Sequence, residues 1–425
     1  MIELFMMGGE KQNAFYATFV PSGTDQIYLT ASYVDASSNI YFTGGLNGGA
    51  SVQFVVGKLN STGVTQWIKI LSYAGGAYPY GVKTDSGGNV YFVASAGSSG
   101  QSGALLTKMD SSGGMVWTRV ISLRTGSGFK LDIDSGDNIY ITGVANDLRT
   151  NSDTAGLIAK YNSSGTLVWH RYLSNGASNE NYYGVCLDGN SNVYVTGVTD
   201  QSDSGDATLV KLDSSGNITW QKIFTSGTDV QLLRAATCYG SNIYVAGYHT
   251  TASGTDAILL KLDTSGSLLW QRRFGNNSAT IFFADVAADD SGNIYVSGVG
   301  NASGSNDAII VKYDSSGNLL WQRRIGSSND EGFYSINSDG GSIIMAGNYR
   351  VSSFQRGMLF KLPNDGSLTG TYNGLTYAST STNNTAAPWS MGTNGAAAIS
   401  NTISTSSPTI GFDTTTTYTF TVTKI

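Results

Sequence analysis

Pairs of aromatic residues recur where one predicted β-sheet of the chain leads into the next. Aromatic rings offer flat, electron-rich faces to the C–H groups of sugars, so several pairs on one surface would suit saccharide binding. The alternative, which we favour, is that the rings fill the apolar entry of each innermost strand. The pairs are Tyr78 and Tyr80, Tyr182 and Tyr183, Phe282 and Phe283, and Phe333 and Tyr334.

One loop is longer than its counterparts and carries charge. Tyr140 and Lys160 differ by 20 in residue number, whereas the equivalent residues elsewhere differ by 17. The insertion makes 146–155 the most projecting loop, and Asp147, Arg149 and Asp153 in it are candidate ligand-binding residues. Further charged residues lie on predicted innermost strands, and strand register decides which of them face a central channel. They are Lys83, Lys130, Arg234 and Asp285.

Acidic residues are densest in the turn DIDSGDN, with Asp132, Asp134 and Asp137. The spacing faintly resembles a calcium loop, in which roughly 6 to 8 oxygens bind the ion. The turn lacks the length and the closing glutamate of such a loop. The recurring Asp-x-Ser-Gly-Asn pattern instead suits a tight turn with glycine at positive φ, capped by the Asp side chain. We therefore predict structural turns and no bound metal.

The residues typical of catalysis are sparse. His170 stands on a predicted outermost strand where other repeats have Gln, and His249 is predicted in a loop. No metalloprotease, nucleophile-elbow or phosphate-loop motif occurs in a suitable context. Paired carboxylates could cleave glycosides, but loops this uniform offer little from which to build a deep pocket. We predict that the chain is not an enzyme and needs no cofactor.

The chain has two cysteines, Cys186 and Cys238, on predicted innermost strands of neighbouring repeats. We expect them to be buried free thiols, because cysteine is common in protein cores. A disulfide between them is the open alternative, which sequence alone does not settle.

These residues are positioned by an internal repeat of about 51 residues. Each repeat contains a strand with Tyr, as in DDSGNIYVSG, followed by a strand, turn and strand, as in AIIVKYDSSGNLLWQRR. The strand-ending lysine, the turn glycine and the tryptophan recur in step, so we interpret them as architectural. The lysines are Lys58, Lys108, Lys160, Lys211, Lys261, Lys312 and Lys361, and the tryptophans are Trp67, Trp117, Trp169, Trp220, Trp270 and Trp321.

The seven lysines and six tryptophans predict that one outermost strand comes from elsewhere. Tyr16 lies 51 residues before Trp67, inside NAFYATFV. We therefore expect residues 13–20 to pair with 357–361 and to complete the last blade. Closure of a ring in this way removes exposed sheet edges. The predicted divisions are an N-terminal arm (1–12), a seven-bladed ring (13–371) and a C-terminal extension (372–425).

The C-terminal extension departs from the repeat. It is rich in Thr, Ser, Asn, Gly and Ala, and its only charged residues are Asp413 and Lys424. Strict alternation in TYTFTVT predicts a half-buried strand, and ISTSSPTIGF is a second candidate strand. We expect this segment to pack on the ring or on another subunit. The Met-rich arm at 1–12 is interpreted as a free terminus or as a peg for a partner.

Composition narrows the partners. The net charge is −6 and basic residues are not clustered, so nothing indicates nucleic-acid binding. No apolar run approaches the roughly 18 residues of a membrane helix. The first residues, MIELFMMGGEKQ, do not form a secretory signal, so we expect no ordinary signal-peptide route if Met1 is the native start. The composition nonetheless looks extracellular.

The repeat unit resembles the seven-bladed β-propeller repeat family common in secreted bacterial and phage proteins, over residues 13–371. The resemblance implies an all-β fold of four-stranded antiparallel blades, but propellers host many functions. The Thr-rich end looks like the β-structured tips of phage tail fibres. We expect a virion structural or adhesion protein of the tail, contacting a host glycan or protein and binding other virion proteins through 1–12 and 372–425. The alternatives are a secreted or surface-displayed bacterial binding propeller, at the cell surface or outside it, and, third, a polysaccharide-active enzyme.

Overall fold

The computed structural model shows an all-β protein whose described residues form strands joined by turns. Among the residues that the structure describes, no helix has the length and apolar character needed to cross a membrane. The described residues are 2–6, 14–19, 25–47, 52–73, 75–97, 102–123, 126–146, 154–174, 179–199, 205–225, 230–275, 280–301, 305–352, 354–367, 370–372, 375–379, 384–385, 390–392, 397–399, 405–406 and 411–412.

The chain divides into two compact units. One comprises Met1–Lys83, Ala284–Ser381 and Thr409–Ile425, and the other comprises Thr84–Phe283 and Thr382–Pro408. The boundaries in the repeat region fall inside two strands, β7 (Ala77–Thr84) and β23 (Thr280–Ala288). Each unit is described separately below.

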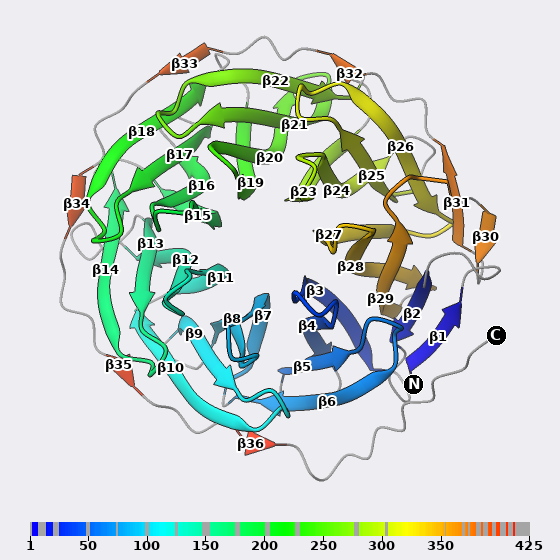
Figure 1. Ribbon diagram of the computed structural model, residues 1–425, viewed down its shortest axis with the longest axis horizontal. Coiled ribbons are helices and arrows are strands. Elements are labelled where there is room, and N and C mark those ends of the chain that lie inside the picture. Colours follow the sequence, from blue (N-terminus) through cyan, green and yellow to red (C-terminus); the bar gives the residue numbers. More distant parts are fainter. Residues whose placement is uncertain are drawn as a thin grey trace. The chain divides into compact units, whose positions relative to one another are not determined.

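The second unit holds sheets of four consecutive antiparallel strands, labelled in Figure 1. Following β7, the first contains β8 (Val90–Ala96), β9 (Ser102–Met109) and β10 (Met115–Leu123). The next contains β11 (Gly126–Ile133), β12 (Ile139–Asn146), β13 (Thr154–Tyr161) and β14 (Leu167–Ser174). Then come β15 (Glu180–Leu187), β16 (Val193–Thr199), β17 (Asp206–Leu212) and β18 (Ile218–Thr225). The last contains β19 (Val230–Tyr239), β20 (Asn242–Thr251), β21 (Gly254–Asp263) and β22 (Leu268–Phe274), and one parallel bridge joins β21 to β23.

The first unit holds sheets of the same kind. One contains β3 (Gln26–Val34), β4 (Ile40–Asn47), β5 (Val52–Leu59) and β6 (Thr65–Ser72). Another continues from β23 with β24 (Ile294–Asn301), β25 (Asp307–Tyr313) and β26 (Leu319–Gly326). A third contains β27 (Glu331–Ser338), β28 (Ser342–Val351) and β29 (Phe354–Pro363).

The N-terminal segment completes that third sheet. The strand β2 (Phe15–Phe19) pairs antiparallel with β29, from Phe15 opposite Lys361 to Phe19 opposite Gly357. The pairing predicted for residues 13–20 with 357–361 is therefore confirmed. The expected free arm is corrected in part, because β1 (Ile2–Met6) pairs with β2 and adds a fifth strand to the sheet.

The strands are apolar on both faces because each sheet packs against another. In the second unit, Tyr91 and Val93 of β8 share one core cluster with Ile139 and Ile141 of β12. All four side chains are fully buried. Burial of a side chain of this size stabilises the fold by roughly 1.5–3 kcal/mol, so the stacked faces supply most of the driving force.

The Asp turns are structural, as predicted. The Asp134 carboxylate accepts hydrogen bonds from the backbone N–H groups of Gly136 and Asn138, both at 2.9 Å, and from the Tyr140 hydroxyl at 3.0 Å. Burial by itself would raise the pKa of Asp134, but these hydrogen bonds outweigh it and lower the pKa. The recurring tyrosine thus anchors the turn that precedes its strand.

Within the second unit, the repeated lysine and tryptophan connect one sheet to the next. Lys160 lies 3.9 Å from Asp134 in its own sheet and donates to the Ser214 carbonyl of the following turn at 3.4 Å. Trp169 donates its Nε1–H to the same carbonyl at 3.0 Å. Its ring covers Gly216, whose φ of 81° is the predicted positive value. The interpretation of both series as architectural is confirmed.

The C-terminal segment runs back along the outermost strands in reverse order (Figure 1). Each short strand pairs antiparallel with the last strand of one sheet: β31 with β26, β32 with β22, β33 with β18, β34 with β14, β35 with β10 and β36 with β6. The tail strands are β30 (Gly370–Tyr372), β31 (Leu375–Ser379), β32 (Asn384–Thr385), β33 (Ser390–Gly392), β34 (Ala397–Ile399), β35 (Thr405–Ser406) and β36 (Gly411–Phe412). The candidate strand ISTSSPTIGF therefore contributes two short strands to different sheets, and TYTFTVT lies outside the described residues.

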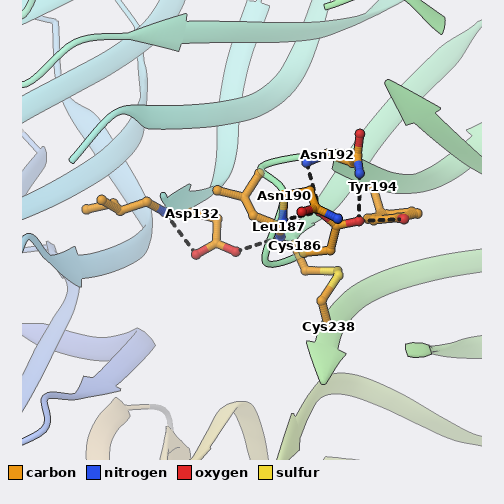
Figure 2. Close-up of a disulfide and its surroundings, with 9 residues drawn as sticks. Asp132, Cys186, Leu187, Asn190, Asn192, Tyr194 and Cys238 are labelled. Atoms are coloured by element: carbon orange, nitrogen blue, oxygen red, sulfur yellow. Dashed lines mark hydrogen bonds between the residues drawn. A yellow bond between two sulfur atoms is a disulfide. The ribbon is translucent and has the colours of Figure 1, made fainter. Parts of the chain in front are cut away.

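The cysteines correct the expectation of free thiols. Cys186 of β15 and Cys238 of β19 form a disulfide, with their Cα atoms 5.6 Å apart (Figure 2). The first strands of adjacent sheets lie close enough to be linked, which sequence could not show. Beside the disulfide, Asp132 accepts hydrogen bonds from the backbone N–H groups of Ile133 and Leu187 and so joins β11 to β15.

Candidate functional site

The first strand of several sheets carries a β-bulge at the same place. In the second unit the register shifts at Phe129 of β11, Tyr183 of β15 and Arg234 of β19. In the first unit it shifts at Thr30 of β3 and Tyr334 of β27. A bulge leaves one residue unpaired and redirects its side chain. The repeat thus presents one adjustable position per sheet on a fixed scaffold.

A glycine on the second strand accompanies each of these bulges. A Cβ atom at Gly143, Gly197 or Gly247 would overlap the carbonyl oxygen of Ser127, Asn181 or Leu232 on the first strand. Gly44 and Gly347 stand in the same relation to Tyr28 and Gly332. Only glycine permits this close approach of the two backbones. The glycine three residues after the repeated tyrosine therefore marks the bulge.

In the second unit, the bulge residues and their neighbours form a continuous row of half-buried aromatic and cationic side chains. The rings of Phe129 and Tyr183 have centroids 5.0 Å apart. The Arg234 guanidinium lies over Phe282 of β23 at 5.1 Å and over Tyr248 of β20 at 5.6 Å. We call these five residues the aromatic row.

Burial and charge act together at the centre of the aromatic row. Burial raises the pKa of the Tyr183 hydroxyl, while the positive charge of Arg234 opposes that rise. Cation–π contacts of this kind contribute about 0.5–2 kcal/mol each. Tyr183 therefore stays a neutral hydrogen-bond donor beside a fixed cation, an arrangement suited to a polar ligand with a flat apolar face.

A second group of aromatic residues lies in the first unit. Tyr28 of β3 is close to Tyr78 and Tyr80 of β7, and burial is the main cause of the raised pKa values of Tyr28 and Tyr80. Tyr78 is 38 % exposed. The Thr30 hydroxyl donates to the Pro79 carbonyl at 2.6 Å and joins the two strands.

The aromatic pairs predicted from sequence are divided between surface and core. Tyr182, Phe283 and Phe333 are buried in the core, so the proposed stacking role is corrected for these three. The reason is the alternation of a strand, which sends neighbouring side chains to opposite faces. Their partners Tyr183, Phe282 and Tyr334, together with Tyr78 and Tyr80, are half-buried or exposed.

The charged candidates have different outcomes. Asp147, Arg149 and Asp153 lie outside the described residues. Lys83 lies over the Tyr33 ring at 5.6 Å, and Asp285 is buried and accepts a hydrogen bond from the Ile336 N–H at 3.2 Å. Lys130 is half-buried beside the bulge at Phe129. Among the described residues of this set, Arg234 is the one that belongs to the aromatic row.

The candidate calcium ligands already have protein partners. Asp132 bonds the backbone of β11 and β15, and Asp134 caps its own turn. Asp137 accepts from the Ser86 N–H at 2.9 Å and from the Ser86 hydroxyl at 2.7 Å. Because their oxygens face donors, the three carboxylates do not form a cation cage.

The two histidines lie on strands of different sheets. His170 lies on β14 with its ring 5.6 Å from that of Tyr172. His249 is corrected from a loop to β20, where it is buried and stands opposite Gln231 and Asp256 in the sheet register. His249, Gln231 and Asp256 thus form a row of buried polar residues across three neighbouring strands.

Comparison with known proteins identifies the repeat family. The family model PQQ_2, described as outer membrane protein assembly factor BamB, matches residues 102–362, which is more than half of the chain. The chain belongs to this family. The matched span begins at β9 and ends in β29, so the repeating sheets of this BamB-family chain are those of a β-propeller repeat protein.

Other comparisons are distant. No curated protein sequence matches the chain. Among solved structures, it is similar to phage phi92 endosialidase, with 12 % identity, a TM-score of 0.48 and coverage of 87 % of this chain and 72 % of that one. The β-propeller domain of Vanderwaltozyma polyspora Nup133 is 10 % identical, with a TM-score of 0.45 and coverage of 84 % and 100 %. The polysaccharide lyase Uly1 is 9 % identical, with a TM-score of 0.48 and coverage of 79 % and 89 %.

Proposed function

We propose that this chain is a non-enzymatic adhesion propeller that binds saccharides through its aromatic row. The observation that carries the proposal is the repeated bulge, which places Phe129, Tyr183 and Arg234 at one position of three consecutive sheets. A repeat that keeps its framework residues and varies its bulge residues has the properties of a binding scaffold. The half-buried rings offer flat apolar area with little side-chain entropy to lose on binding.

A glycan array with matched variants tests the proposal. Phe129→Ala and Tyr183→Ala should each reduce saccharide binding at least tenfold, because each removes one stacking face. Leu320→Ala is the control, since Leu320 is an exposed apolar residue of β26 outside the aromatic row. Equal binding by all three variants and the parent would overturn the proposal. A reducing-end assay on the bound glycan should show no cleavage, and release of sugar ends would make the chain an enzyme.

We further propose that this propeller is part of a virion, as a tail-fibre or tail-associated protein. The support is the strand-like tail, in which Asp413 and Lys424 are the only charged residues. In such an assembly the segments 1–12 and 372–425 would contact neighbouring subunits. Cross-linking of purified virus particles followed by mass spectrometry tests these contacts. Absence of the chain from the particles would reject the virion proposal.

The disulfide favours a second possibility, that the chain is a secreted or surface-displayed bacterial binding protein. Disulfides form and persist in oxidising compartments and are rare in the cytosol. The Cys186–Cys238 link therefore fits a chain that matures outside the cytoplasm. Fractionation of the producing cell distinguishes the two proposals, since a secreted protein is found in the periplasm or medium in the absence of virus particles.

The ring itself is also a proposal. We propose seven blades that close into a ring through the pairing of β2 with β29, because the repeat spacing yields seven strand-ending lysines and β2 supplies the fourth strand of the last sheet. Class averages of the particle or the isolated protein viewed along the ring axis should show seven blades. Six or eight blades would reject the count.

A further inference from the structure

Arg234 differs from every other arginine that the structure describes. Four arginines lie over a tryptophan ring, and each donates to a backbone carbonyl: Arg119, Arg171, Arg272 and Arg323. Arg273, Arg324 and Arg350 pair with aspartates, and Arg356 donates to the Asp25 carbonyl. Within the described residues, the buried Nε of Arg234 has no hydrogen-bond acceptor. The Arg234 guanidinium instead lies over the rings of Tyr248 and Phe282.

This environment leaves the hydrogen-bonding capacity of Arg234 available to a ligand. The rings of Tyr248 and Phe282 attract the guanidinium through their faces and do not satisfy its in-plane N–H groups. A buried donor without an acceptor is destabilising. A planar guanidinium presents two parallel N–H groups, whose geometry matches a carboxylate or another oxyanion. An oxyanion would therefore satisfy the group and neutralise its charge.

The residues next to Arg234 suit the remainder of such a ligand. Tyr183 and Arg234 occupy the same bulge position on β15 and β19, the two strands that the Cys186–Cys238 disulfide joins. Phe129 extends the apolar surface beyond Tyr183. The order along the aromatic row is thus two stacking rings followed by a cation, which fits a chain of sugars in which an acidic group follows a sugar face.

We propose that the ligand of the aromatic row is an acidic saccharide, with Arg234 binding its carboxylate or sulfate group and Tyr183 and Phe129 stacking on the adjoining sugar. This inference rests on the proposed saccharide-binding function and specifies its substrate class. Arg234 is the residue that determines specificity for charge, while the two rings contribute affinity for sugars of either kind.

The test is calorimetric titration of the full-length protein with three saccharide probes and, for comparison, an oligodeoxythymidylate. Oligogalacturonate carries carboxylates, a sulfated galactan oligomer carries sulfates, and an unsubstituted galactan oligomer of the same length is neutral. We expect an acidic probe to bind at least tenfold more tightly than the neutral one, with affinity that falls as salt is added. Whichever acidic probe binds more tightly identifies the group that Arg234 prefers.

Variants connect the charge preference to one residue. Arg234→Gln should remove the preference for the acidic probe, so that acidic and neutral probes bind the variant with similar affinity. Arg234→Lys should retain part of the preference, because lysine keeps the charge but not the paired donors. Leu320→Ala is the control, and melting temperatures establish that each variant is folded.

The outcomes separate this inference from the proposed function. If the neutral probe binds the parent as tightly as the acidic probes and Arg234→Gln changes nothing, the acidic-ligand inference fails while saccharide binding stands. If none of the three probes binds, the proposed function fails as well. Tighter binding of an oligodeoxythymidylate than of any saccharide would also overturn the inference, because bases stack on aromatic residues beside a cation in the same way.

Discussion

Gly197 of β16 lies against the backbone carbonyl of Asn181 on β15, so closely that a Cβ atom at Gly197 would overlap that oxygen. The contact is the local cause of the bulge at Tyr183, because the first strand can approach the second only where no side chain intervenes. The identity of one framework residue thus determines the placement of a candidate binding residue on the neighbouring strand.

Gly197→Ala should therefore destabilise the protein and displace Tyr183. We expect a loss of about 1–3 kcal/mol in the free energy of unfolding, as for other overpacked sites, together with weaker saccharide binding. Urea denaturation and calorimetry measure the two effects. Gly189→Ala is the matched control, since nothing lies within 4 Å of a Cβ atom there. Equal stability of the two variants would show that the close approach does not hold the bulge.

The disulfide gives a second prediction. Cys186 and Cys238 are 52 residues apart in sequence, and loop-closure entropy for such a span contributes at most about 4 kcal/mol to the stability. Reductant should lower the free energy of unfolding of the parent by up to this amount. A Cys186→Ser, Cys238→Ser double variant should be less stable and insensitive to reductant. A parent that unfolds identically with and without reductant would argue against a disulfide in the folded protein.

The repeat made the fold accessible from sequence, while the site was only partly so. Lys160, Trp169 and Gly216 recur at fixed spacing, and their contacts follow from that recurrence. Tyr182 and Tyr183 could not be assigned to core or surface, because a bulge at Tyr183 shifts the register between Tyr182 and Gly184. The sequence feature that indicates the bulge is the glycine three residues after the repeated tyrosine, which is Gly197 in this sheet.

The contacts between sheets were beyond the reach of local pattern. Cys186 and Cys238 belong to separate repeats, and their bond depends on how closely two first strands approach. The same holds for Arg234 and Phe282, which are brought together only by packing of neighbouring sheets. Periodicity states which residues share a position in the repeat, but it contains no distance between one sheet and the next.

Glu331 predicts a dependence of stability on pH. Its side chain is buried, with 3 % exposure, and the Ser327 N–H and hydroxyl donate to it. Burial is the main cause that raises the pKa of Glu331 from 4.5 to about 7, with Asp307 and Asp330 adding to it. The folded state therefore holds its proton more tightly than the unfolded state does. Stability should fall as pH rises from about 4.5 to about 7, and then level off.

Glu331→Gln isolates this effect. By the free energy that corresponds to such a shift, the parent should lose at most about 3 kcal/mol across the interval, while the neutral amide should show a much smaller slope. Urea denaturation at pH 5, 6, 7 and 8 measures the stability of the parent and of the variant. The turn aspartates, such as Asp188, have lowered pKa values and stay ionised over this pH range. A parent with constant stability over this range would contradict the prediction.

The tail yields a final prediction about association. The outermost strands β26, β22, β18, β14, β10 and β6 would present unpaired backbone groups without the short strands of the C-terminal segment. Exposed sheet edges pair with other chains, so a variant ending at Ser367 should form concentration-dependent oligomers in light scattering. Its melting temperature should change little, because each tail strand contributes only a few backbone pairs, such as two between β10 and β35. A peptide of residues 368–425 added in trans should restore the monomer. If the truncated protein stays monomeric without the peptide, the tail does not protect the edges, and its pairing with them serves another purpose.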